Sequence, residues 1–136
     1  MVLSKDSLKI EKEQDVVLFR NRVRELAVKI GMSLLGQTKL ITAASELARN
    51  MLKYGGGGVV TLEVVSANRT TGVRLTFEDK GPGIADIGLA MQDGYSTAKS
   101  LGLGLPGAKR LVNEFDIKST VGEGTTVTIT RWKNAV

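Results

Sequence analysis

The order of the predicted helices and strands places this chain of 136 residues in the α+β class. Helical patterns come in blocks and strand patterns come in adjacent pairs, which favours an antiparallel or mixed sheet with helices on one face. The length predicts a single domain over residues 1–136, because a typical domain has ~150 residues. An apolar fraction of 42% and a charged fraction of 24% are ordinary for a globular protein.

The first half of the chain predicts a short strand and two amphipathic helices. Residues 8–11 alternate between apolar and charged side chains, as in a strand. A helical period begins at residue 15 and continues to Gly31, a typical stop signal. A second helix is expected over residues about 37–53. Four consecutive glycines, residues 55–58, follow it and predict a flexible connector.

Alternating apolar and polar residues predict two β-hairpins in the second half. The strands of the first hairpin are expected over residues 60–64 and 73–77. A glycine-rich region and then a third amphipathic helix, over residues 105–115, separate the hairpins. The strands of the second hairpin are expected over residues 117–121 and 125–132.

Composition excludes several classes of chemistry. The chain has no cysteine and no histidine, so disulfides, thiolate metal sites and the Ser-His-Asp triad are excluded. The net charge is +5, but the basic residues are scattered and aromatic residues make up 4%, which disfavours nucleic acid as a partner. We find no transmembrane segment and no signal peptide, so we expect a cytoplasmic protein that does not associate with membranes.

Two polar residues of the second predicted helix form the first candidate site. Glu46 and Asn50 are four residues apart, so their side chains share one helical face. A carboxylate and an amide in this arrangement suit a general base and a ligand for Mg²⁺, which prefers oxygen ligands and also takes phosphate oxygens. The alternative is an incidental pair on a solvated face.

An acidic residue followed by glycines forms the second candidate, directly after a predicted strand. Gly81 and Gly83 flank a proline, so the backbone after Asp79 can bend sharply and approach a ligand closely. The Asp79 carboxylate is an acceptor for an exocyclic amine such as that of adenine. The alternative is a plain turn, since all three residue types are common in turns.

Two further glycine motifs follow. Gly102 and Gly104 belong to a G-x-G-x-x-G pattern that opens the third predicted helix, where backbone N–H groups face an anion. A loop rather than a strand precedes this pattern, which argues against a dinucleotide-binding βαβ unit. The last motif, G-x-G-T, ends at Thr125 and is by itself typical of a turn before a strand.

Taken in order, the four motifs resemble the GHKL nucleotide-binding fold. That order is E-x-x-x-N on a helix, D-x-G-x-G after a strand, G-x-G-x-x-G before a helix and G-x-G-T before a strand. Within this family, residues 45–50, 79–84, 93–97 and 104–111 resemble switch protein kinases of the RsbT type. The resemblance implies a Bergerat-type two-layer sandwich that binds ATP and Mg²⁺ between the second helix and the glycine loops.

The resemblance also implies a role for each matched residue. Glu46 would be the general base that accepts the proton of the attacking hydroxyl, and Asn50 would hold Mg²⁺ against the phosphates. The remaining implied nucleotide-binding residues are Asp79, Gly81, Gly83, Gly102, Gly104 and Thr125. Gly81 and Gly83 would let the adenine pack closely, and Gly102 and Gly104 would cradle the phosphates. Thr125 would support the adenine through Asp79 or a water.

The activity implied by the resemblance is phosphorylation of serine or threonine in STAS-domain proteins, as a partner switch in bacterial stress signalling. A PP2C-type phosphatase or another output enzyme is implied as a second partner. The first alternative is a binding module, an anti-sigma factor whose nucleotide is mainly structural, and the second is a nucleic-acid-binding domain. A sensor histidine kinase is disfavoured because no histidine is present to accept the phosphoryl group. Autophosphorylation on Ser96, Thr97 or Ser100 is not expected.

Overall fold

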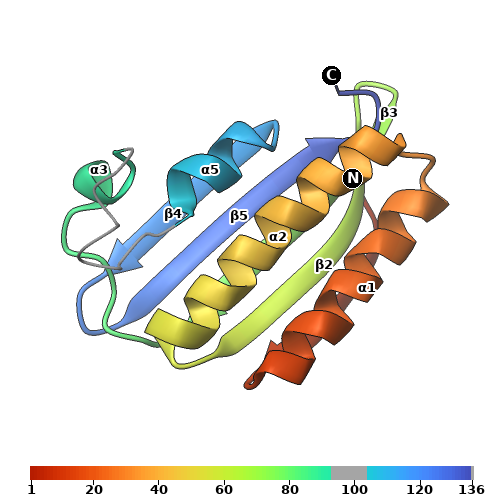
Figure 1. Cartoon of the computed structure of the whole chain (residues 1–136). Coiled ribbons are helices and arrows are strands. Elements are labelled where there is room, and N and C mark those ends of the chain that lie inside the picture. The colour runs from red at the N-terminus through yellow and green to blue at the C-terminus, as the bar shows by residue number, and fades with distance from the viewer. Residues whose placement is uncertain (93–103, 136) are drawn as a thin grey trace.

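The computed structural model describes residues 1–92 and 104–135. Helices cover one face of a five-stranded sheet in the order β1-β2-β3-β5-β4, and every pair of neighbouring strands is antiparallel (Figure 1). This arrangement confirms the predicted α+β class. The strands are β1 (Val2–Ile10), β2 (Gly58–Ala67), β3 (Thr70–Asp79), β4 (Glu114–Thr120) and β5 (Gly124–Trp132). The helices described are α1 (Glu13–Lys29), α2 (Leu34–Gly55), α3 (Ile87–Ala90) and α5 (Leu105–Arg110).

The core lies between the sheet and the helices α1 and α2. Leu62, Leu75 and Ile129 of the three central strands are at most 1% exposed, and burying each such side chain stabilises the fold by about 1.5–3 kcal/mol. Phe19 of α1 packs edge to face on Phe77 of β3, with ring centroids 5.6 Å apart. The central strands therefore form a closely packed layer under α2, the helix that carries the first motif.

Helix α2 is longer than the predicted helix at both ends. It begins at Leu34 rather than near residue 37 because Ser33 caps it: the Ser33 hydroxyl oxygen accepts the N–H of Gly36 at 3.1 Å. At 22 residues it is the longest of the described helices. None of the described helices is long and apolar enough to cross a membrane.

Of the four glycines at residues 55–58, the first is the last residue of α2, the last is the first residue of β2, and three are closely packed, so the expectation of a flexible connector is wrong. Gly56 ends the helix in the left-handed conformation, with φ at 75°. A Cβ atom on Gly58 would lie 2.1 Å from the carbonyl oxygen of Glu78 on the neighbouring strand. A Cβ atom on Gly55 would lie 2.7 Å from the Asp79 carboxylate oxygen Oδ2. These glycines let the end of α2 approach the end of β3.

The third helix is shorter than predicted. Helix α5 ends at Arg110, residues 111–113 form a turn, and the last two residues expected in the helix belong instead to β4, which begins at Glu114. From this residue polar and apolar side chains alternate, and Phe115 pairs with Ile129 of β5. The strand period prevails because β4 gains a full ladder of hydrogen bonds at the sheet edge.

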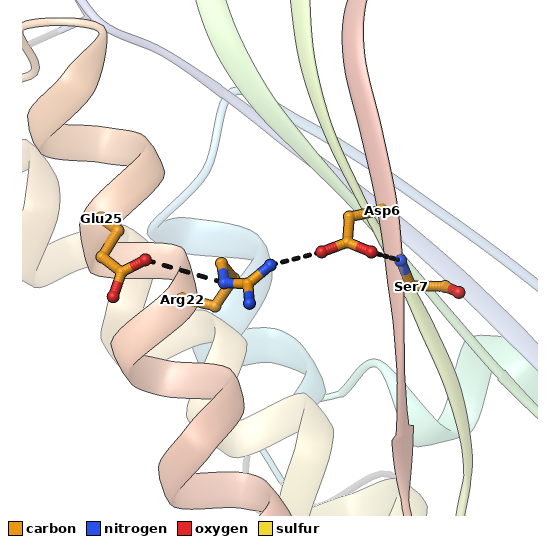
Figure 2. A network of polar contacts seen from close by, with 4 residues as sticks. All are labelled: Asp6, Ser7, Arg22 and Glu25. Atoms are coloured by element: carbon orange, nitrogen blue, oxygen red, sulfur yellow. Dashed lines mark hydrogen bonds and ion pairs between the residues drawn. The ribbon is translucent and has the colours of Figure 1, made fainter.

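Polar contacts join the edge strand β1 to α1 (Figure 2). Strand β1 is longer than the predicted strand. Arg22 of α1 forms an ion pair with Asp6 of β1 and lies 3.7 Å from Glu25 of its own helix. The other Asp6 oxygen accepts the N–H of Ser7 at 2.8 Å. These side chains are exposed, so each ion pair stabilises the fold by at most about 1 kcal/mol.

The first hairpin has a two-residue turn at Asn68 and Arg69, whose φ angles are +51° and +65°. Positive φ at both positions is typical of the turn whose twist matches that of paired strands.

At the same end of the sheet, Arg131 is 3% exposed and donates to the carbonyl oxygens of Leu111 and Ala135 at 3.0 and 3.4 Å. Burial lowers the pKa of the Arg131 guanidinium below its usual value.

Candidate active site

A pocket opens between the C-terminal half of α2 and the ends of β3 and β5. Its empty volume is about 530 Å³, including the part open to solvent. Its lining residues are Leu47, Asn50, Met51, Tyr54, Gly55, Phe77, Asp79, Pro82, Gly83, Ile84, Leu105, Thr125 and Val127. Apolar walls with a few polar groups are typical of small-molecule sites.

Asp79 is the acidic residue of the pocket lining. Its Oδ1 accepts the backbone N–H of Gly81 at 2.9 Å and that of Thr125 at 3.3 Å. Within the part of the chain that the structure describes, Oδ2 has no hydrogen-bond partner. Two backbone groups therefore fix the carboxylate, and its second oxygen is available to accept a hydrogen bond from a ligand.

The glycines around Asp79 bring backbone segments into direct contact. A Cβ atom on Gly81 would lie 2.7 Å from the Cα of Gly55, and one on Gly83, where φ is +77°, would lie 2.4 Å from the carbonyl oxygen of Thr120. Gly124 has φ at +124°, and its Cβ atom would lie 2.1 Å from the carbonyl oxygen of Asp79. The motif glycines are thus required by backbone packing, a reason that the sequence analysis did not identify.

Glu46 and Asn50 lie one turn apart on α2 and both approach Gly104. A Cβ atom on Gly104 would lie 2.9 Å from Glu46 Oε2 and 3.6 Å from Asn50 Nδ2. The Glu46 side chain is 46% exposed and lies 3.8 Å from the guanidinium of Arg49. Asn50 lines the pocket, whereas Glu46 lies beside it. The pair therefore faces the start of α5 at one end of the site.

Gly102 lies outside the described residues, as do Ser96, Thr97 and Ser100. Within the described residues there is no group of three acidic residues that would bind a metal through protein ligands alone. The Asn50 amide oxygen fits a Mg²⁺ ion that takes its other ligands from phosphate and water.

Ser119 and the apolar walls of the pocket lie outside the motifs of the sequence. The Ser119 hydroxyl oxygen accepts the N–H of Ile84 at 2.7 Å and lies 2.7 Å from the Thr125 hydroxyl oxygen. Its position opposite Thr125 follows from the register of the second hairpin. The walls include Met51, Phe77 and Val127, apolar residues that neighbour the motifs on α2, β3 and β5, and this proximity was a usable signal.

The fold and the pocket define the class of protein: a domain in which helices on one face of an antiparallel sheet border a pocket lined by apolar side chains and Asp79. Residues 36–135 match the model of the histidine kinase-, DNA gyrase B- and HSP90-like ATPase family. The chain belongs to this family. The match begins at the start of α2 and includes every motif identified in the sequence.

Among curated proteins, the chain is 42% identical to serine/threonine-protein kinase RsbT of Bacillus subtilis over 125 residues, covering 92% of this chain and 94% of that protein. This similarity assigns the chain to the class of protein serine/threonine kinases. It is 28% identical to an anti-sigma F factor of a Thermoanaerobacter species over 130 residues, covering 90% and 89% of the two chains.

A solved structure with the same fold contains the RsbU and RsbW domains of a Mycobacterium tuberculosis protein. The TM-score is 0.64, and the sequences are 23% identical over 98% of this chain. This chain spans about a third, 34%, of the length of that chain. The similarity extends to the fold alone.

Proposed function

We propose that the protein is a partner-switching kinase that transfers the γ-phosphoryl group of ATP to a serine or threonine of a STAS-domain protein. The observation that carries the proposal is the Asp79 carboxylate in an apolar pocket. Both backbone N–H groups that contact it donate to Oδ1, so Oδ2 is left for a ligand. The 6-amino group of adenine supplies the N–H donor that this oxygen lacks.

The phosphates would then extend from the pocket along α2 toward Asn50 and Gly104. The distance from a Gly104 Cβ atom to Asn50 Nδ2 would be 3.6 Å, so helix α2 and the start of α5 are close enough to contact one group together. Asn50 would hold Mg²⁺ through its amide oxygen. When bound, the ion neutralises charge on the phosphates.

Glu46 would act as the general base. Its side chain lies beside Gly104 and is 46% exposed, so a hydroxyl group of another protein can reach it. In the transfer step, the acceptor oxygen bonds to the γ-phosphorus as the bond to the β,γ-bridging oxygen breaks, and Glu46 takes the hydroxyl proton. A positioned base of this kind contributes roughly 10²–10⁴ to a rate.

Partner switching would follow from the charge of the product. A phosphoryl group on the STAS protein adds nearly two negative charges at about neutral pH, which weakens docking near bound phosphates and favours release. The freed kinase would then bind its second partner, a PP2C-type phosphatase or another output enzyme. Both steps would take place in the cytoplasm.

The test combines the purified chain with γ-³²P-labelled ATP, Mg²⁺ and STAS-domain proteins. We expect stable phosphate on the STAS protein, none on this chain, and weaker binding after transfer. Phosphate on Ser96, Thr97 or Ser100 with an unmodified STAS protein would overturn the proposal.

A second candidate is a binding module that uses its nucleotide mainly for structure. The similarity to anti-sigma F factors favours it. In the same mixture, a binding module would form a nucleotide-dependent complex without transferring phosphate, so the labelled product distinguishes the two functions.

A further inference from the structure

The Ser119 hydroxyl joins three segments beside the pocket: β4, the start of β5 and the loop that holds Ile84. Ser119 is in β4, directly opposite Thr125 of β5. Its oxygen accepts the N–H of Ile84 at 2.7 Å, lies 3.1 Å from the carbonyl oxygen of Gly124, and lies 2.7 Å from the Thr125 hydroxyl oxygen. None of the nucleotide-binding motifs found in the sequence includes this residue.

Counting protons determines the direction of these hydrogen bonds. A serine hydroxyl donates one proton and accepts at two lone pairs, and Ile84 uses one lone pair of Ser119. If Ser119 donates to the Gly124 carbonyl, Thr125 donates to the second lone pair and all three contacts are hydrogen bonds. If Ser119 instead donates to Thr125, its contact with Gly124 has no proton. The first arrangement is favoured because it satisfies one more polar group.

We infer that Ser119 is a positioning residue that fixes the direction of the Thr125 hydroxyl and thereby the base preference of the pocket. Because the Thr125 proton points to Ser119, the Thr125 hydroxyl keeps only lone pairs for a ligand in the pocket that this residue lines. Asp79 Oδ2 also presents lone pairs. These acceptors favour a base with a 6-amino group, which donates to them, and disfavour a base with a 6-oxo group, which has no proton to donate at that position.

This inference rests on the proposed function, because it requires that the pocket binds the base of a nucleotide. Removing the Ser119 hydroxyl frees the Thr125 proton to turn toward the pocket. There it donates to a 6-oxo oxygen, so a nucleotide that the native pocket rejects becomes more acceptable. A residue that only held the loops together would weaken every nucleotide to the same extent.

The experiment measures the affinities of Mg·ADP and Mg·IDP, the inosine analogue, by calorimetry. In Ser119→Ala, we expect the ratio of ADP affinity to IDP affinity to fall by about 3- to 10-fold, the effect of one hydrogen bond. Thr128→Ala removes a hydroxyl from β5, the strand of Thr125, on the opposite face of the sheet, and it should leave the ratio unchanged.

An isosteric pair keeps the test independent of folding. Ser119→Thr retains the hydroxyl and should retain the native ratio, whereas Ser119→Val has the same shape without the hydroxyl and should show the reduced ratio. In a Thr125→Val background, neither Ser119 substitution should change the ratio further.

Two results would overturn the inference: equal weakening of both nucleotides, or a change in the ratio that persists in the Thr125→Val background. A native protein that binds neither nucleotide would refute the proposed function itself. A native protein that binds ADP, with a ratio that is insensitive to Ser119, would refute this inference alone.

Discussion

The two ends of the candidate site are built from different parts of the chain. At the base end, backbone N–H groups hold Asp79, and glycines bring three segments into contact. At the transfer end, two side chains of α2 reach toward Gly104, and one of them, Glu46, is nearly half exposed. Backbone contacts that hold the fold together therefore form the base end, whereas partly exposed side chains of α2 form the transfer end.

This difference separates binding from chemistry. A change at the base end alters the packing of β3, β5 and their loops, so it affects folding together with nucleotide affinity. A change at the transfer end alters a side chain that few neighbours require, so it affects the rate while the fold remains. The same framework thus suits both a kinase and a nucleotide-dependent binding module.

The largest expected effect concerns the transfer end. Glu46→Gln removes the proposed base but keeps the size of the side chain, so phosphotransfer should slow by roughly 10²–10⁴ while ADP affinity stays the same. Single-turnover kinetics and calorimetry measure the two quantities. Thr42→Ala, an exposed position one turn earlier on α2, is the control. A loss of affinity with normal turnover would reverse the roles assigned to the two ends.

The next effect concerns the folding of the base end. Gly124→Ala places a Cβ atom 2.1 Å from the Asp79 carbonyl oxygen at a φ of +124°. Because both atoms belong to paired strands, we expect a loss of about 2–5 kcal/mol in the free energy of unfolding. Urea denaturation measures it.

Gly122→Ala in the same turn is the matched control. Its φ is +82°, but no heavy atom lies within 4 Å of the added Cβ, so it should lose only about 1–2 kcal/mol, the cost of the left-handed conformation. Equal losses in the two variants would show that the contact with Asp79 adds nothing to the backbone strain.

Except for the short helix α3, the element types were predictable from the sequence, but the end of the third predicted helix was not. The strands and α2 follow clear periods of two and 3.6 residues. Leu111 and Phe115 fit both periods, since their spacing of four residues is a multiple of two and close to one helical turn. Pairing with β5 across the sheet decides for a strand at Phe115, and no local pattern contains that contact.

The site was predictable to a similar degree. Asp79 and Asn50 each belong to a short motif that can be recognised from neighbouring residues alone. The structure places both in one pocket. Ser119 was not found because its contacts with Ile84 and Thr125 depend on strand register and on a loop 35 residues earlier. The roles of Glu46, Asn50 and Asp79 stay predictions, which the variants above and below test.

A smaller effect is expected for nucleotide affinity at the base end. Asp79→Asn replaces an acceptor with an amide that can present N–H to the adenine amine, a mismatch of about 1–3 kcal/mol, or roughly 10- to 100-fold in affinity. Calorimetric titration with Mg·ADP measures it. The control is Glu78→Gln, the neighbouring exposed carboxylate, which should bind normally. An unchanged affinity in Asp79→Asn would remove Asp79 from the base contacts.

The smallest effect concerns the point where the two ends meet. Asn50 lines the pocket and also approaches Gly104, so its loss should alter binding through the metal rather than through the base. In Asn50→Ala we expect Mg·ADP to bind about 3- to 10-fold more weakly, the effect of one ligand or hydrogen bond. Binding of ADP without Mg²⁺ should change little, because Asp79 and the apolar walls remain.

Titrations with and without Mg²⁺, in the native protein and in Asn50→Ala, form a thermodynamic cycle that measures the coupling between Asn50 and the metal. Thr42→Ala should show the native dependence on Mg²⁺. If Asn50→Ala weakened ADP equally in both conditions, Asn50 would contact the nucleotide directly and would belong to the base end. If it weakened neither, the metal would depend on other groups, and the transfer end would consist of Glu46 and the start of α5 alone.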